Sequence, residues 1–560
     1  MLAVLPFENL GLPADAYFAD GLTDEVRSRL SGVAGLRVIG GASARQYKGT
    51  TKSVSEIARE LGATHLLTGT VRWEHTANGG RVRVSPELVR ASDQATMWAV
   101  PVDGPLDDVF AMQTKVAERV ASALDVALVA GERRAVASRP TTNLAAYDAY
   151  LRGLAASTMA GMSTGEGLRP AIAEFKRAIA LDSGFVAAHA RLALAYNLAT
   201  YMGGADSSGP SKSRESAARA WALDSNLIES RLARAASFMA VGRPDLGAQT
   251  LRAAAGTAPG NADLFLLLAL AEEQSGRPGP GIEAARTSAM LDPRSASAFG
   301  RLAELYDRTY QYEKAIAARD QEIALTPQNS VAFAAQAWSY LLWRADTAAA
   351  RQMLIRGGPA LETDWVMLMP GFYTAASALW QAVLPPVTLR VRDTVTADGF
   401  RRATKGGSGP EMYHFMKMRH LRASGRIAEV RAHAESLVVL LAPMLRERGD
   451  LWETYQSLRA ALAEAEAELG RTADAARESD RVVAEARRSG KVLDLSSALA
   501  AAAYVDVLLG RRDVAVARLS EAFQQPAGLQ AVSRALLRAD PSWTPLRGHP
   551  GFERLVAERD

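Results

Sequence analysis

One pentapeptide has the spacing of a serine-hydrolase nucleophile: Gly161-Met162-Ser163-Thr164-Gly165 fits the pattern G-x-S-x-G. In hydrolases this pattern lies on a sharp turn between a strand and a helix, which strains the serine and exposes its hydroxyl. Here the preceding stretch YDAYLRGLAAST has a helical pattern, so we expect the pentapeptide in a turn between two helices. A hydrolase hypothesis would rest on Ser163 alone, and we predict no such site.

Metal and phosphate chemistry have no better support in the sequence. His414 and His420 are six residues apart, so they do not share a helical face as a zinc-binding pair four residues apart would. The chain has no cysteine and no H-E-x-x-H motif. The stretches QYKGTTKS and TKGGSG lack the spacing of a phosphate-binding loop, and no series of kinase motifs occurs. The sequence therefore predicts a non-enzyme with no catalytic residue, bound metal or cofactor.

Two acidic residues share one face of an expected helix near the N-terminus. Asp20 and Asp24 are four residues apart, which places both carboxylates on the same side. They could contact a cation or a basic peptide. The alternative is that they only favour the start of the helix, because carboxylates near a helix N-terminus interact well with its dipole.

Four charged residues lie on helices that would line the inner face of a helical array: Arg191, Arg301, Glu304 and Arg308. On a concave face they could bind an extended or acidic peptide through bidentate contacts. The alternative reading is an ordinary solvated surface. These four residues, with Asp20 and Asp24, are the candidate partner-binding residues.

The composition is that of an ordinary folded protein in 560 residues, with 48% hydrophobic and 22% charged residues and a net charge of +4. No basic stripe with interleaved aromatic residues occurs, so we expect no nucleic-acid partner. The most apolar runs, LFLLLAL and LVVLLAP, are too short to span a membrane, and no signal peptide is visible. As written, the chain is expected in the cytoplasm; a membrane helix upstream of Met1 would place it outside.

The first 130 residues have the pattern of an α/β domain with a mixed sheet and packed helices. A strand is expected from Leu2 to Phe7 and a helix with apolar residues at every fourth position up to Leu30. Asn78-Gly79 between two strand patterns predicts a hairpin, because both residues tolerate positive φ. A long amphipathic helix, Leu106 to Leu124, closes the unit.

Five stretches of this region resemble the TolB-like amino-terminal domain: AVLPFENL, AYFADGLTDEV, GLRVIGGASARQYKG, IARELGATHLLTGTVRW and DDVFAMQTKVAERVASAL. They keep the order of that family over nearly all of residues 2–128. The resemblance implies a binding or sensing domain without catalytic residues. It also implies a bacterial protein in which this domain is fused to tetratricopeptide (TPR) repeats, often downstream of a Ser/Thr kinase, an adenylate cyclase or a winged-helix module.

A 34-residue period dominates the next part of the chain. Ser225, Pro259, Pro293 and Pro327 follow the last helical turns of successive repeats, which is the spacing of TPR repeats. We therefore predict an all-α TPR-type superhelical solenoid after the α/β domain. The expected order is a linker at 131–143, TPR repeats at 144–356, an irregular segment at 357–410, divergent helix pairs at 411–528 and a C-terminal cap at 529–560.

These patterns together favour a non-catalytic scaffold of a bacterial signalling system that binds protein or peptide partners on the concave face of its repeats. The alternative is the regulatory or sensor tail of a Ser/Thr protein kinase, an adenylate cyclase or a transcriptional regulator. A strand that begins at Leu2, directly after Met1, favours an effector domain upstream. The ligand and the oligomeric state do not follow from the sequence.

Overall fold

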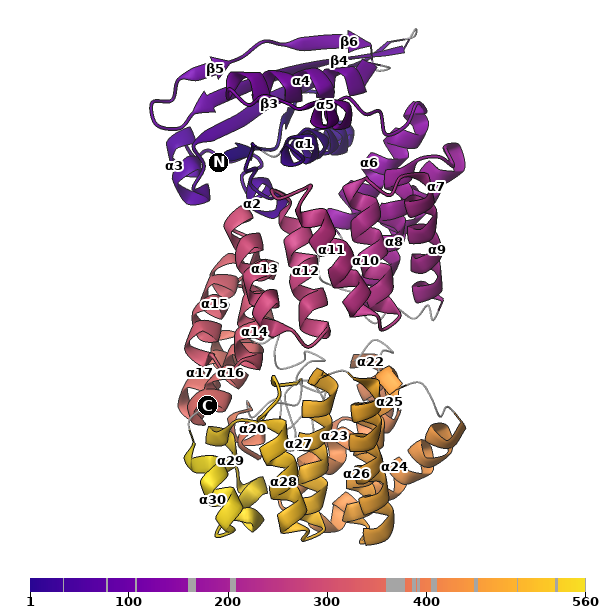
Figure 1. Cartoon of the computed structure of the whole chain (residues 1–560), viewed down its shortest axis with the longest axis vertical. Helices are drawn as coiled ribbons and strands as arrows, with labels where there is room; N and C mark the ends of the chain where they lie inside the picture. Colours follow the sequence, from indigo (N-terminus) through magenta and orange to yellow (C-terminus); the bar gives the residue numbers. More distant parts are fainter. Residues whose placement is uncertain are drawn as a thin grey trace. The chain divides into compact units, whose positions relative to one another are not determined.

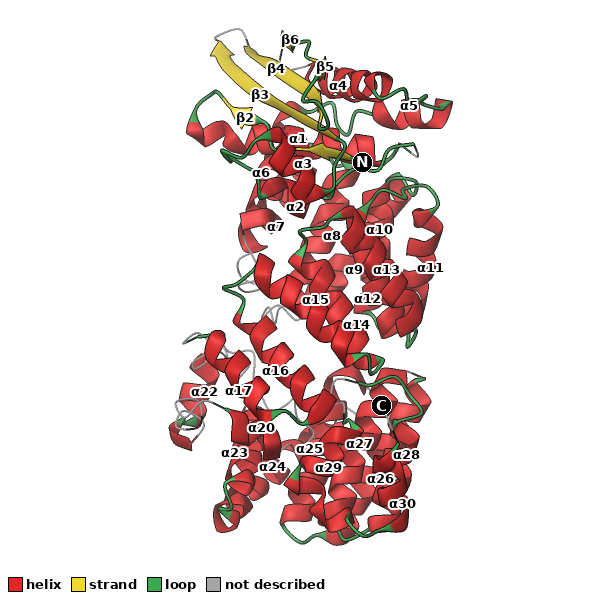
Figure 2. Ribbon diagram, turned by 90° about the vertical axis from the view of Figure 1, so that its left-hand side faces the viewer, coloured by secondary structure: helices red, strands yellow, loops and turns green. Residues whose placement is uncertain are grey.

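Strands occur only near the N-terminus of the described chain, and helices follow one another from there to the C-terminus (Figures 1 and 2). The computed structural model describes residues 1–33, 35–76, 79–105, 108–159, 168–201, 208–358, 378–384, 389, 393–403, 410–447, 452–490, 492–528 and 532–558. The chain divides into two units, the first comprising Met1–Glu272 and Glu283–Ala298, the second Glu273–Ile282 and Phe299–Asp560. The predicted fold class, an α/β N-terminal region followed by a TPR-type helical array, is confirmed.

The sheet in the first unit is mixed, as the sequence predicts. It contains β1 (Leu2–Val4), β2 (Glu8–Asn9), β3 (His65–Thr76), β4 (Gly79–Arg90), β5 (Thr96–Trp98) and β6 (Val102–Pro105). β1 and β2 run parallel to β3, whereas β4 is antiparallel to β3, β5 and β6. β3 and β4 form the long hairpin that Asn78-Gly79 predicted; Asn78 itself lies outside the described residues.

Alternation along the strands sends side chains to two different cores. Val4 and Leu67 point to the face covered by helices α1 (Ala16–Ser31) and α4 (Val109–Ala123). Their neighbours Ala3 and Leu66 point to the other face, which is covered by α3 (Val54–Leu61). The sheet is therefore buried on both sides and is not a free binding surface in its central part.

Part of the expected linker at 131–143 is helical and held to the α/β region. Helix α5 (Ala130–Val136) occupies its first half. The guanidinium of Arg29 on α1 donates to the backbone oxygen of Val136 and, at 3.0 Å, to that of Ser138. These contacts explain why this segment is ordered rather than a loose connection.

Antiparallel helix pairs follow, with the predicted period. They are α6 (Leu144–Met159) and α7 (Arg169–Leu181), α8 (Val186–Tyr201) and α9 (Gly209–Leu223), α10 (Ile228–Ala240) and α11 (Pro244–Ala255), α12 (Ala262–Gln274) and α13 (Pro278–Leu291), α14 (Ala296–Arg308) and α15 (Tyr312–Leu325), and α16 (Ser330–Arg344) and α17 (Thr347–Arg356). From α10 onward, each first helix begins 34 residues after the previous one.

The second unit continues with looser pairs and a cap. Its further helices are α20 (Ala378–Val383), α22 (Ala397–Ala403), α23 (Pro410–Ala423), α24 (Ile427–Glu447), α25 (Trp452–Glu468), α26 (Thr472–Ser489), α27 (Val492–Leu508), α28 (Arg512–Ala522), α29 (Arg534–Ala539), η4 (Pro541–Leu546) and α30 (Pro550–Ala557). Trp543 and Phe552 of the C-terminal segment share a core with Trp338 and Leu341 of α16. Of the segment 357–410, expected to be irregular, the described parts include the short helices α20 and α22.

The turns inside the pairs are alike. Five glycines have φ between 71° and 75°, each two residues after its first helix ends: Gly242, Gly276, Gly425, Gly470 and Gly510. The divergent pairs thus use the same turn as the regular repeats. At the equivalent position after α14 stands Tyr310, with φ of 59°.

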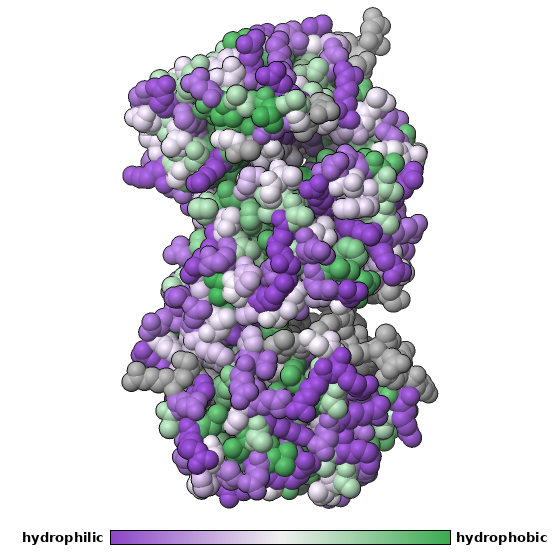
Figure 3. Space-filling view, viewed as in Figure 1, coloured by the Kyte–Doolittle hydropathy of each residue, from purple (hydrophilic) through white to green (hydrophobic). Residues whose placement is uncertain are grey.

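Hydrophilic side chains spread over most of the face drawn in Figure 3, and hydrophobic ones lie between them in small groups. A large apolar patch therefore does not mark a binding surface on that face. Every helix within the described ranges is too short or too polar to cross a lipid bilayer.

In the first unit, hydrogen bonds join the α/β region to the turn after α13. The carboxylate of Asp292 accepts hydrogen bonds from the backbone N–H of Ser43 at 2.7 Å and of Ala42 at 3.3 Å, at the start of the short helix α2 (Gly41–Arg45). The Ser43 hydroxyl accepts from the backbone N–H of Arg294 at 2.7 Å. Burial raises the pKa of Asp292, and the hydrogen bonds from Ser43 and Ala42 oppose this effect in part, so these donors stabilise the carboxylate.

A second contact fastens α1 to the first repeat. Gly21 lies against Leu151 of α6, where a Cβ atom would come within 2.5 Å of the leucine. Tyr17 donates to Asp148, and Arg152 donates to the Tyr17 hydroxyl at 2.9 Å. The α/β region is therefore part of the same unit as the early repeats, rather than a domain on a tether.

Replacement of Asp292 by alanine should lower the free energy of unfolding by about 1–3 kcal/mol, because the buried N–H of Ser43 and the partly buried N–H of Ala42 would lose their acceptor. Asp292→Asn, which keeps an acceptor oxygen, should lose less. Asp245→Ala, at an exposed ion pair with Arg243, should change stability by less than about 0.5 kcal/mol. Urea unfolding of the three variants measures this; equal effects of Asp292→Ala and Asp245→Ala would contradict the role of Asp292.

Candidate functional site

The two acidic candidates of α1 are bonded to basic residues of the same unit. Asp20 accepts from the Lys48 ammonium at 2.6 and 2.7 Å. Asp24 pairs with Arg27 at 2.5 Å and with Arg45 at 3.6 Å. Basic groups of the chain itself thus occupy both carboxylates, and an external basic peptide would have to compete with these contacts.

Arg191, on α8, lies in a half-buried cluster. Burial opposes its charge, but Tyr150, Glu229 and Asp263 outweigh burial and raise the pKa of Arg191. Glu25 of α1 lies near the same cluster, and burial raises its pKa to about 7. The α/β region therefore lies close to this candidate residue.

The other three candidates come together in the second unit. Arg301 donates to Glu273 at 2.7 Å and to Glu304 at 2.6 Å, and Arg308 also donates to Glu273. The Glu273 side chain is 3% exposed, and the two guanidinium groups outweigh burial and lower its pKa. Sequence reasoning missed Glu273, because nothing in the pattern of α12 distinguishes it from its neighbour Glu272.

This cluster is occupied from one side by the chain itself. Arg308 donates to the backbone oxygen of Ala527 at 3.1 Å, and the N–H of Ala527 donates to the backbone oxygen of Arg308 at 2.8 Å. A partner at this place would have to displace the segment around Ala527 or bind beside it.

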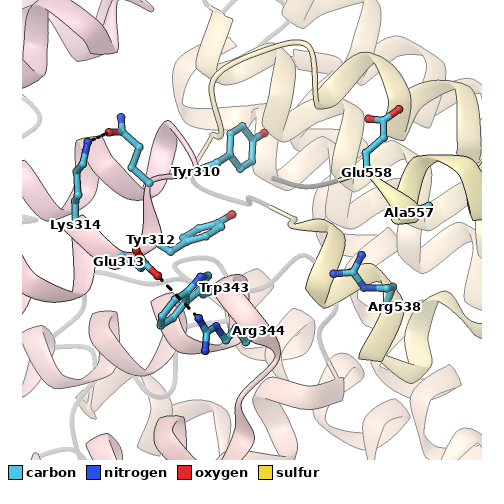
Figure 4. Close-up of a pocket in the computed structure, with 10 residues that line it drawn as sticks. Tyr310, Tyr312, Glu313, Lys314, Trp343, Arg344, Arg538, Ala557 and Glu558 are labelled. Atoms are coloured by element: carbon cyan, nitrogen blue, oxygen red, sulfur yellow. Dashed lines mark hydrogen bonds and ion pairs between the residues drawn. The ribbon is translucent and has the colours of Figure 1, made fainter.

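The second unit also has an open groove of about 670 Å³, drawn in Figure 4. Residues 310–314, at the turn between α14 and α15, and Trp343 and Arg344, at the end of α16, form one wall. Arg538 of α29 and residues 557–558 at the end of α30 form the other. The tyrosine rings point into the space between the walls in Figure 4. A volume of this size is in the range of ligand-binding sites.

Aromatic rings and charges alternate in the groove. The rings of Tyr310 and Tyr312 meet edge to face with centroids 6.3 Å apart, and Tyr310 also contacts Phe523 at 6.0 Å. The guanidinium of Arg344 lies 3.7 Å from the centroid of the Trp343 ring. Tyr310 and Trp343 are half-buried, whereas Tyr312 is 3% exposed and belongs to the core behind them. Aromatic rings that are partly open to solvent, such as those of Tyr310 and Trp343, are typical of recognition surfaces.

Sequence analysis did not find the groove, because its walls come from segments more than 190 residues apart in the chain. One local signal was available. Tyr310 stands where Gly276 stands one repeat earlier, so an aromatic residue replaces a glycine that the turn favours. A position in a repeat that breaks its own pattern is a reason to look for a special role.

The two histidines of α23 have different partners, as their spacing predicts. His414 on α23 meets His433 on α24, with their Nδ1 atoms 2.9 Å apart, whereas His420 lies 3.9 Å from Asp393. No cluster of three or more metal-ligating side chains occurs among the described residues. Gly161 to Gly165 lie outside the described ranges.

Burial and the nearby His414 and Lys417 lower the pKa of His433 to about 4, against a weaker opposing effect of Glu429; burial also lowers the pKa of His414. In the unfolded chain histidine binds its proton near pH 6.5. Between about pH 6.5 and 4 the unfolded state therefore binds more protons, and stability falls as the pH falls.

His433→Gln should remove part of this dependence. Thermal melts at a series of pH values should show the wild type losing more stability than the variant as the pH falls from about 6.5 towards 4. Ser436→Ala, a neighbouring exposed position on α24, serves as the control and should follow the wild type. Parallel pH profiles for wild type and His433→Gln would show that the pair does not titrate in this way.

No model of a known protein family matches the chain. A curated protein of Rhizobium meliloti (strain 1021), named "Putative adenylate cyclase 3", is 37% identical over 195 residues, which cover 34% of this chain and 32% of that protein. The match thus spans about a third of the length of this relative.

Solved structures of TPR proteins resemble parts of the chain. A thermophilic TPR protein of Thermus thermophilus is 16% identical, with 35% of this chain and 100% of that one covered and a TM-score of 0.31. pilF of Pseudomonas aeruginosa is 20% identical, with 39% of this chain and 91% of that one covered and a TM-score of 0.30. YrrB, a TPR protein with an unusual peptide-binding site, is 16% identical, with 33% of this chain and 89% of that one covered and a TM-score of 0.24. The helix pairs of this chain are of TPR type by their own spacing and turns.

Proposed function

We propose that the chain is a non-catalytic scaffold of a bacterial signalling system that binds a segment of a partner protein. The observation that carries this proposal is the groove of Figure 4, with its aromatic rings, charged rim and open side. The concave cluster of Arg301, Glu304 and Arg308 would extend the binding surface if the segment at Ala527 moves aside.

The α/β region has a separate part in this proposal. Its resemblance to the TolB-like domain supports a second recognition role for residues 1–130. Because α2 and α1 are bonded to the repeats of the first unit, a ligand of the α/β region would act on a surface continuous with those repeats.

Tyr310→Gly tests the groove. It removes an aromatic wall but restores the glycine of the other turns, so the backbone should accept it. Loss of an aromatic anchor should weaken partner binding by about 2 kcal/mol, or about thirtyfold. The assay is quantitative affinity capture from the native cells, followed by mass spectrometry.

Ala345→Gly is the matched control, because Ala345 also has a left-handed backbone, with φ of 53°, but does not line the groove. A partner retained by wild type and Ala345→Gly and depleted with Tyr310→Gly would support the proposal. Identical sets of captured proteins for all three would refute a binding role for the groove.

A second proposal is that the chain is the regulatory or sensor tail of a larger protein, for example an adenylate cyclase. The sequence similarity to the Rhizobium protein favours it. The intact mass of the native protein tests it. A product clearly heavier than the 59.8 kDa of this chain would support the tail, and a mass of 59.8 kDa would contradict it.

A further inference from the structure

We propose that the groove binds an acidic peptide segment, whose carboxylates meet Arg344 and the neighbouring basic side chains and whose apolar side chains meet the aromatic wall. This inference rests on the proposed function, since it names the chemistry of the partner that the groove would take.

Among the basic residues of the groove, Arg344 is the one best placed to bind a carboxylate. Its guanidinium lies 3.7 Å from the Trp343 ring centroid, and stacking on an aromatic face fixes the guanidinium plane. Its side chain is 64% exposed, and its only ion pair with a described residue is a long one of 3.9 Å to Glu313. Most of the guanidinium is therefore accessible to solvent, and its planar set of N–H groups is suited to a bidentate contact with a carboxylate.

The charges around Arg344 favour an acidic ligand. Lys314 and Arg538 also line the groove, against the acidic residues Glu313 and Glu558. Glu558 already pairs with Arg534, which is outside the lining, at 2.6 Å. Glu313 is the one acidic side chain of the lining that faces the basic groups without another close partner among the described residues, so the groove has an excess of positive charge. Such an excess attracts acidic partners and speeds their association.

The aromatic wall supplies the apolar half of the site. Tyr310 adopts a left-handed backbone that costs a non-glycine residue about 1–2 kcal/mol, whereas five other turns of this kind have glycine, at Gly242, Gly276, Gly425, Gly470 and Gly510. The strained residue places its ring beside Tyr312 at the groove. Strain of this kind persists where the surrounding contacts hold it, and here the Tyr310 ring packs against Tyr312 and Phe523. An occupant with alternating acidic and apolar side chains therefore fits both halves.

Fluorescence anisotropy of the full chain tests the inference with two labelled probes. One is a peptide of about ten residues with alternating glutamate and leucine, and the other replaces each glutamate by glutamine. The acidic probe should bind at least about tenfold more tightly, and salt should weaken it. Arg344→Gln should abolish this preference, and Glu313→Gln should strengthen binding of the acidic probe.

Arg488→Gln is the matched control, because Arg488 is also exposed, also has a 3.9 Å pair with a glutamate, and lies outside the groove. It should behave as wild type. Equal binding of both probes, no binding of either, or equal losses for Arg344→Gln and Arg488→Gln would overturn the acidic preference. These outcomes leave the scaffold proposal to the capture experiment, which depends on Tyr310 and not on the charge of the ligand.

Discussion

In each helix pair whose turn lies within the described ranges, one residue with a left-handed backbone helps to reverse the chain. In five of these pairs the residue is a glycine two residues after the first helix, with φ between 71° and 75°, and after α16 it is Ala345, one residue after the helix. Glycine adopts this conformation without a steric penalty, because it has no Cβ. The turn therefore has the same length in each of these five pairs, which explains why the divergent pairs α23–α28 still resemble the regular repeats.

Tyr310 occupies the same turn position after α14. It adopts the left-handed backbone at a steric cost, and its ring lines the groove.

The parts of the fold that were predictable depend on neighbours in sequence. The 34-residue spacing indicated α10 to α16, and Asn78-Gly79 between two strand patterns indicated the hairpin β3–β4. The shared position of Arg301, Glu304 and Arg308 also follows from helical spacing within α14. Contacts between distant segments were not predictable. Nothing in the local pattern marks Asp292 as the acceptor for Ser43, and the groove needs residues from the turn at 310 and from the C-terminal helices together.

Contact with the α/β region changes what the early repeats can do. A carboxylate buried beside α2 is stable only with its two N–H donors, so a ligand that pulls α2 away would leave Asp292 buried without compensation. Oppositely charged or hydrogen-bonding groups of the first unit also lie beside three of the candidate residues, Asp20, Asp24 and Arg191. The Asp292 contacts join the α/β region to the repeats, whereas the pairs of Asp20 and Asp24 lie within the α/β region itself. A partner would have to compete with all of these contacts.

The two candidate surfaces of the second unit, the cluster around Glu273 and the groove, differ in how many existing interactions a partner would break. At the cluster of Arg301, Arg308 and Glu273, a partner that binds the two arginines leaves Glu273 as an uncompensated buried charge, which costs about 3–5 kcal/mol when one member of such a pair is removed. At the groove, Arg344 has only a long contact to an exposed glutamate, so a carboxylate can bind it with little loss elsewhere. Binding at the groove breaks only the long, exposed Arg344–Glu313 contact, whereas binding at the cluster must first replace interactions that already stabilise the fold. This difference favours the groove, rather than the more conspicuous arginines of α14, as the first point of contact for a partner.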